Sequence, residues 1–173
     1  MMTIISGTNR SGSNSFKIAE YCKKYAISQG VEVELLDLES IPASTFLEGS
    51  YGNYSDSFSQ ILEKKIEPAT HLMYIVPEYN GSYPGILKLF LDMAPPSIWK
   101  GKKTALIGLA TGRSGNQRGL DHLMAVLHYL NMEVYSKKPL LSSIHLHLNE
   151  EGNISNQEYK SLIDNQIQGF KNF

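Results

Sequence analysis

The sequence predicts a doubly wound α/β fold with a parallel sheet of five strands and helices on both faces. Short apolar runs alternate with stretches of helical periodicity at the spacing of βαβ units, and three of the runs lead into loops rich in glycine and polar residues. In this fold, ligands bind beyond the carboxyl ends of the strands. We therefore expect the three loops to meet at one edge of the sheet and to form a single site.

The expected strands are short, and the most apolar of them reads as buried on both faces. They cover residues 2–5, 31–38, 71–76, 103–110 and 132–135, the last with Leu140, Leu141 and Ile144 beyond it. Helical periodicity covers residues 13–29, 58–66, 84–94, 120–130 and 159–167. Residues 39–56 lack a sustained period and are expected to form a loop, either a binding segment or a variable surface segment.

Composition bounds the class of protein. The 173 residues are expected to form one domain, 1–173, with an ordinary globular content of 42% hydrophobic and 19% charged residues. The net charge of −1 gives no general attraction to nucleic acid or anionic lipid. The lone cysteine, Cys22, cannot form an internal disulfide, and we expect a semi-buried, inert thiol. Without a membrane-spanning run or a secretory pattern, the expected location is cytoplasmic.

The first loop, residues 6–15, lies between an apolar run and a helix. Its glycines allow close backbone approach, its hydroxyls donate hydrogen bonds, and the helix N-terminus that follows carries partial positive charge. Arg10 adds a planar fork that suits phosphate. The loop therefore predicts a phosphate site, with a capped strand-to-helix turn as the alternative.

The second and third loops suit a flat ligand. Residues 77–85 contain two prolines and two glycines, whose backbone N–H groups can meet the carbonyls and ring nitrogens of a heterocycle, and Tyr79 offers an aromatic face or edge. Residues 111–119 can border a second edge of a ring, and Arg113 and Arg118 can attract the phosphates of a dinucleotide. The alternatives are an ordinary turn in the second loop and solvated arginines in the third.

Together, the three loops carry a resemblance. The segments GTNRSGSNS (7–15), PEYNGSYPGILK (77–88) and TGRSG (111–115) resemble the flavin-contacting segments of the NADPH-dependent FMN reductase family, in matching order over roughly residues 2 to 135. That family is flavodoxin-like and includes quinone, azo-dye and chromate reductases. The resemblance implies bound FMN, with NADPH or NADH as co-substrate.

The resemblance also implies a set of cofactor-binding residues. Those expected to hold the FMN phosphate are Thr8, Arg10, Ser13, Asn14 and Ser15. Those expected to border the ring and ribityl chain are Pro77, Glu78, Tyr79, Asn80 and Gly81 on one side, and Thr111, Gly112 and Arg113 on the other. The chain departs from the family pattern at Thr8 (usually Ser), at Ser15 (usually Asn) and at Thr111 (often Gly). Whether Asn14 or Ser15 takes the phosphate contact therefore stays open.

The implied activity is a ping-pong hydride transfer from NADPH to the flavin and on to a small acceptor, such as free flavin, a quinone, an azo compound or a metal oxyanion. It requires no catalytic acid or base and no metal, and the five histidines show no triad or metal spacing. His145 and His147 could share a strand face, although surface positions are favoured. The family implies a homodimer or homotetramer, in which Tyr51 and Tyr54 could reach a neighbouring site.

Two other functions compete with this one. The first is a flavodoxin-like electron carrier or flavin-binding regulator that does not turn over NADPH. Near-neutral charge disfavours the carrier, because such proteins generally dock through acidic surfaces. The second is a phosphate-handling enzyme that uses the first loop alone, which lacks a Cys or Asp nucleophile and a Gly-Lys-Ser/Thr ending.

Overall fold

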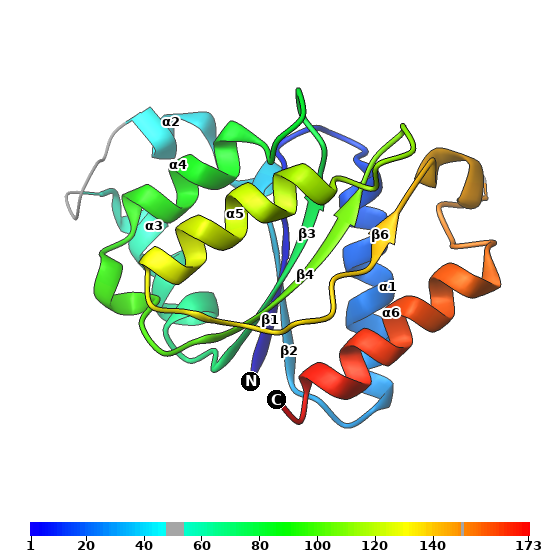
Figure 1. The fold of residues 1–173 in the computed structure, drawn as a ribbon. Coiled ribbons are helices and arrows are strands. Elements are labelled where there is room, and N and C mark those ends of the chain that lie inside the picture. Colours follow the sequence, from blue (N-terminus) through cyan, green and yellow to red (C-terminus); the bar gives the residue numbers. More distant parts are fainter. Residues whose placement is uncertain (48–53, 150) are drawn as a thin grey trace.

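The computed structural model describes residues 1–47, 54–149 and 151–173, which are arranged around a parallel sheet (Figure 1). The strands lie in the order β2-β1-β3-β4-β5, and β6 also pairs with β4. Their bounds are β1 (Met2–Ser6), β2 (Val33–Asp37), β3 (His71–Pro77), β4 (Lys103–Leu109), β5 (Glu133–Val134) and β6 (Leu140–Leu141). The predicted α/β fold with a parallel sheet is confirmed. The expected last strand is split, because β5 pairs with the start of β4 and β6 with its end.

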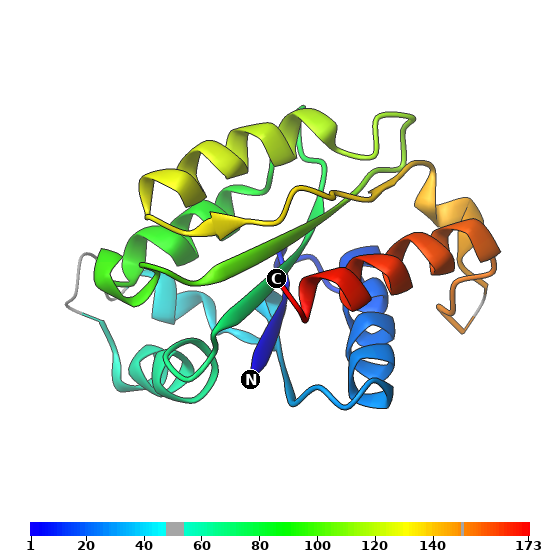
Figure 2. The ribbon, with the colours of Figure 1, turned by 60° about the horizontal axis from the view of Figure 1, so that its bottom comes forward.

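Helices cover both faces of the sheet (Figures 1 and 2). Their bounds are α1 (Asn14–Ser28), α2 (Ala43–Leu47), α3 (Asp56–Ile61), α4 (Gly85–Met93), α5 (Gln117–Tyr129) and α6 (Gln157–Phe170). One face carries α1 and α6, and the other carries α3, α4 and α5. The predicted helices are present with ends shifted by a few residues, and a π-type turn, Leu62–Ile66, extends α3.

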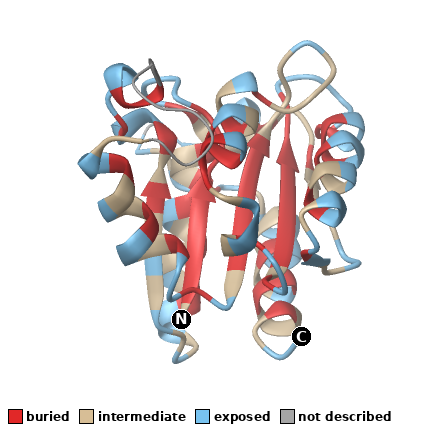
Figure 3. Cartoon of the chain, turned by 90° about the vertical axis from the view of Figure 1, so that its left-hand side faces the viewer, coloured by how far each residue is buried: buried red, intermediate tan, exposed pale blue. Residues whose placement is uncertain are grey.

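The central strands explain the two-sided core. Residues 72–76 of β3 and 104–109 of β4 are buried without interruption, as strands covered on both faces require (Figure 3). On the α4 side, Phe90 packs edge-to-face on Phe58 at 5.7 Å and on Trp99 at 5.9 Å between ring centroids. On the α1 side, Cys22 is fully buried among aliphatic side chains, deeper than the semi-buried position expected from sequence.

The segment that follows β2 is more regular than the expected loop. A 3₁₀ turn over Leu38–Ser40 and the short helix α2 occupy its first part, and α3 begins at Asp56. The ring of Tyr54 packs edge-to-face on Phe58 of its own chain at 5.3 Å. Tyr51, the other tyrosine expected to reach a partner, lies outside the described residues. Across the described part of the chain, no helix has the length and apolar character needed to cross a membrane.

Candidate functional site

The three predicted loops meet at the carboxyl edge of the sheet, at the top of Figure 1, and enclose a cavity of about 440 Å³. This volume lies within the range of about 300–1,000 Å³ that is typical of small-molecule sites. The lining comes from each loop and from the turn after β6: Thr8, Arg10, Ser11, Gly12, Ser13, Asn14, Ser15, Pro77, Glu78, Tyr79, Leu109, Ala110, Thr111, Ile144 and His145. Nine of the thirteen residues expected to bind the cofactor are in this set.

The first loop leaves β1 through a narrow crossing. Gly7 donates its N–H to the Ile75 carbonyl at 2.9 Å, and a Cβ at this position would lie 3.0 Å from that same oxygen. Glycine therefore lets the chain pass over β3 and turn toward α1. Gly12, with a φ of +63°, completes the turn before the helix begins.

The start of α1 presents hydrogen-bond donors to the cavity. Ser13 is the N-cap, and its Oγ accepts the N–H of Phe16 at 3.1 Å. The first turn contains no acidic residue, so the positive end of the helix is not neutralised. Half-buried Asn14 and exposed Arg10 lie at the same end of the cavity. This arrangement suits an anion such as a phosphate group.

Thr8 connects the first loop to the second. It is fully buried, its Oγ1 accepts the N–H of Arg10 at 3.3 Å, and it shares a 2.8 Å hydrogen bond with the Tyr79 hydroxyl. The Tyr79 ring is therefore held by its hydroxyl at the cavity wall. Thr8 lines the cavity and at the same time joins the first loop to the second.

The tip of the second loop is a tight turn with two central residues, Asn80 and Gly81. Tyr79 and Ser82 exchange backbone hydrogen bonds of 2.9 and 3.0 Å, and Asn80 and Gly81 both have positive φ, as a type I′ turn requires. Asn80 and Gly81, at the tip of this turn, do not line the cavity. The Arg118 guanidinium lies beside the turn, 3.2 Å from where a Cβ on Gly81 would stand.

The third loop is fastened to the second by side chains. Asn116 is fully buried in a left-handed conformation (φ 69°), and its Nδ2 donates to the Val76 carbonyl at 3.0 Å. The Ser114 hydroxyl accepts the Asn116 N–H and donates to the Glu78 carboxylate. Hydrogen bonds thus join the second and third loops, which form two walls of the cavity. Thr111 lines the cavity, whereas Gly112 and Arg113 do not.

Sequence reasoning missed six lining residues: Ser11, Gly12, Leu109, Ala110, Ile144 and His145. The first four lie within or directly before loops that were identified. Ile144 and His145 have no local signal, because they reach the cavity only through the pairing of β6 with the end of β4. Ile144–His147 form a 3₁₀ turn, so the alternative of a shared strand face for His145 and His147 is wrong; His147 packs on Tyr159.

The arrangement can bind a ligand that is anionic at one end and flat at the other. Hydroxyl groups, the Arg10 guanidinium and a helix N-terminus form the first end, while Leu109, Ala110 and Tyr79 border the rest. These features fit FMN, whose phosphate and ring are joined by a flexible chain. Within residues 1–47, 54–149 and 151–173, no group of three or more His, Cys, Asp or Glu side chains could hold a metal ion.

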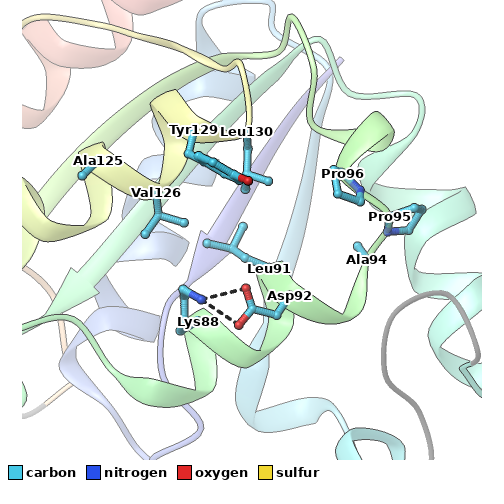
Figure 4. A pocket seen from close by; sticks show the side chains of 10 residues that line it. All are labelled: Lys88, Leu91, Asp92, Ala94, Pro95, Pro96, Ala125, Val126, Tyr129 and Leu130. Atoms are coloured by element: carbon cyan, nitrogen blue, oxygen red, sulfur yellow. Dashed lines mark hydrogen bonds and ion pairs between the residues drawn. The ribbon is translucent and has the colours of Figure 1, made fainter.

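A second hollow lies away from this cavity, in the groove between α4 and α5 (Figure 4). Its volume is about 510 Å³, and its walls are mostly apolar, with Leu91, Val126 and Leu130 pointing into it. Lys88 and Asp92 form an ion pair of 2.7 Å on one side, and Tyr129 lies on the other. Apolar surfaces of this kind mark contacts with other molecules.

Comparison with known proteins agrees with the geometry of the cavity. The chain is 30% identical over 172 residues to an NAD(P)H-dependent FMN reductase of Pseudomonas aeruginosa, an alignment that covers 96% of this chain and 91% of the relative. It is 31% identical to an FMN-dependent NADPH-azoreductase of Staphylococcus saprophyticus, with 73% and 69% covered. It is 36% identical to an NAD(P)H:quinone oxidoreductase of Solanum tuberosum, with 59% and 55% covered.

Solved structures show the same fold. The apo form of an NADH:FMN oxidoreductase superposes with a TM-score of 0.78 at 23% identity, covering 98% of this chain and 87% of the other. An archaeal flavodoxin superposes with a TM-score of 0.59 at 17% identity, covering 99% of both chains. The sequence profile of the family described as NADPH-dependent FMN reductase matches residues 1–145. The chain therefore belongs to the NADPH-dependent FMN reductase family.

Proposed function

We propose that residues 1–173 form one FMN-binding domain that acts as an NAD(P)H oxidoreductase on a small acceptor such as a free flavin, a quinone, an azo compound or a metal oxyanion. The observation that carries the proposal is the cavity where the N-terminus of α1, Ser13 and Arg10 meet the cross-linked second and third loops. Bound FMN would supply the redox chemistry, taking a hydride from NADPH and passing the electrons on in a second half-reaction.

The residues of the chain would bind and orient the cofactor. Ser13, Asn14 and Arg10 would hold the phosphate, and Pro77, Glu78, Tyr79 and Thr111 would border the ring and ribityl chain. Asn80, Gly81, Gly112 and Arg113 would act at the rim, since they lie outside the cavity lining. No catalytic acid or base is assigned, because a hydride transfer between two cofactors needs none from the protein. A cytoplasmic location remains a prediction.

The test is a visible absorption spectrum of the purified protein, followed by NADPH oxidation measured under air with and without an added quinone. We expect a flavin spectrum and steady NADPH consumption that the quinone accelerates. Flavin binding without NADPH consumption would favour an electron carrier or regulator. The fold that the chain shares with an archaeal flavodoxin is compatible with that alternative. A colourless protein that cannot be loaded with FMN would refute both functions.

We also propose that two copies pair through the groove between α4 and α5. The support is its apolar lining and Tyr129, a residue at its edge that is 85% exposed. A pair of identical helix faces suits a two-fold dimer. Since α4 follows the second loop and α5 follows the third, the partner would lie close to the cofactor site.

Sedimentation velocity tests the pairing. Val126→Glu should yield a monomer, because it would bury a charge in the interface. Leu146→Glu is the matched control, since Leu146 is an exposed apolar side chain in the turn after β6. A wild-type monomer, or equal mass for both variants, would contradict this interface.

A further inference from the structure

The N-cap hydroxyl of α1 is surrounded by donors. Ser13 Oγ accepts the Phe16 N–H at 3.1 Å and also accepts a hydrogen bond of 3.0 Å from the Ser15 hydroxyl. A hydroxyl oxygen has two lone pairs and one proton. Both lone pairs of Ser13 are therefore occupied on the helix side, and its own proton is left to point away from the helix, toward the cavity that Ser13 lines.

Burial fixes the direction of the bond between the two serines. Ser15 is fully buried, and across the described residues its hydroxyl has no side-chain hydrogen-bond partner other than Ser13. A buried donor without an acceptor is costly, so the Ser15 proton must point at Ser13. Ser13 is 8% exposed and can give its own proton to a ligand. The reverse orientation would strand the Ser15 proton inside the protein.

We propose that Ser15 is a positioning residue that makes the Ser13 hydroxyl a dedicated donor to the phosphate of the flavin, without touching the ligand itself. The proposal rests on the proposed function, in which this end of the cavity holds a phosphate. The hydrogen bond from Ser15 also polarises the Ser13 hydroxyl, which strengthens it as a donor. A phosphate dianion is charged and has only acceptor oxygens. A donor held in one orientation therefore stabilises a phosphate group more than it stabilises a neutral hydroxyl group at the same place.

This assignment separates two neighbours that the sequence could not tell apart. Both residues border the cavity, but Asn14 is half-buried and its side chain can meet the ligand, whereas Ser15 lies behind Ser13 in the wall with no surface exposed to solvent. Direct contact therefore belongs to Ser13 and Asn14. Ser15 is one hydrogen bond away from the ligand-binding group, so its effect on the ligand must pass through Ser13.

The test compares FMN with riboflavin, which has the same ring and ribityl chain but no phosphate. Apo-protein variants Ser15→Ala, Ser13→Ala and the double variant are titrated with each flavin, and binding is followed by quenching of flavin fluorescence. We expect Ser15→Ala to raise the Kd for FMN by about three- to tenfold, the range of one net hydrogen bond, with riboflavin affinity unchanged. Combined with Ser13→Ala, Ser15→Ala should add no further loss for FMN.

Each outcome decides between the alternatives. Equal loss of FMN and riboflavin affinity in Ser15→Ala would mean a purely structural role and would overturn the proposal. An unchanged FMN Kd, or full additivity in the double variant, would overturn it as well. If Ser15→Ala does not fold, Ser15→Cys keeps the shape of the side chain, with a larger terminal atom that is a weaker donor, and it should show the same FMN-specific loss. Wild-type protein that binds neither flavin would refute the proposed function itself, a distinct result.

Discussion

The first turn of α5 packs so closely on the second loop that Gly119 has no room for a side chain. A Cβ there would lie 2.0 Å from Asn116 Oδ1 and 2.7 Å from the carbonyl carbon of Ser82. Asn116 is held in place because it is fully buried and donates to the Val76 carbonyl, and the Ser82 atom belongs to the backbone. Gly119→Ala must therefore move α5 away from the second loop.

The expected cost follows from two opposing terms. Overpacking a tight site lowers the free energy of unfolding by about 1–3 kcal/mol. Replacing glycine by alanine inside a helix raises it by about 1 kcal/mol, because alanine has the higher helix propensity. Because both contacts are far too short and one is with backbone, the steric term should fall in the upper part of its range. We expect a net loss of about 1–2 kcal/mol in the free energy of unfolding. For a chain of this size, this lowers Tm by about 2–8 °C.

Thermal unfolding followed by circular dichroism measures the loss, and FMN titration measures its effect on the site. Gly85→Ala is the matched control: Gly85 is the first residue of α4, and a Cβ there would meet nothing within 4 Å. The control should melt at or slightly above the wild-type temperature. Gly119→Ala should also bind FMN more weakly, because the second and third loops separate. Wild-type melting and FMN affinity in Gly119→Ala would refute the reasoning.

Three further predictions follow from single side chains. Arg10→Ala should raise the Kd for FMN by about 10- to 100-fold, the range of a charged hydrogen bond, with Tm unchanged; an unaltered Kd would remove Arg10 from the phosphate site. Burial raises the pKa of the Cys22 thiol, so Ellman's reagent at pH 8 should react only in denaturant, and prompt labelling of native protein would contradict this burial. Burial, with the Lys103 charge, lowers the pKa of His71 from its usual 6.5, so the unfolded chain gains the proton first on acidification. The free energy of unfolding should therefore fall as the pH drops below about 6.5, and urea titrations of His71→Asn should show a flatter dependence.

Much of the fold was readable from local pattern, because the central strands are short and mostly apolar runs. The meeting of the three loops at one edge followed from topology alone, and the cavity lining bears it out. The local sequence pattern does not reveal positions that depend on long-range strand pairing or on particular backbone angles. His145 reaches the cavity through β6, and Asn80 is carried past it by a type I′ turn. The helix α2 is too short to leave a periodic signal.

The two ends of the cavity are built from different kinds of contact, and this difference separates affinity from reactivity. Side-chain and capping groups that act on charge, such as Ser13 and Arg10, form the end that we propose holds the phosphate. The ring end is shaped by backbone turns whose positions are fixed by Asn116 and Ser114. A flavodoxin and an NADH:FMN oxidoreductase both superpose on this chain, so the fold alone does not decide the function. Changes at the phosphate end should therefore alter the Kd for FMN at constant kcat of the loaded enzyme, whereas shifts of the second and third loops should alter kcat as well.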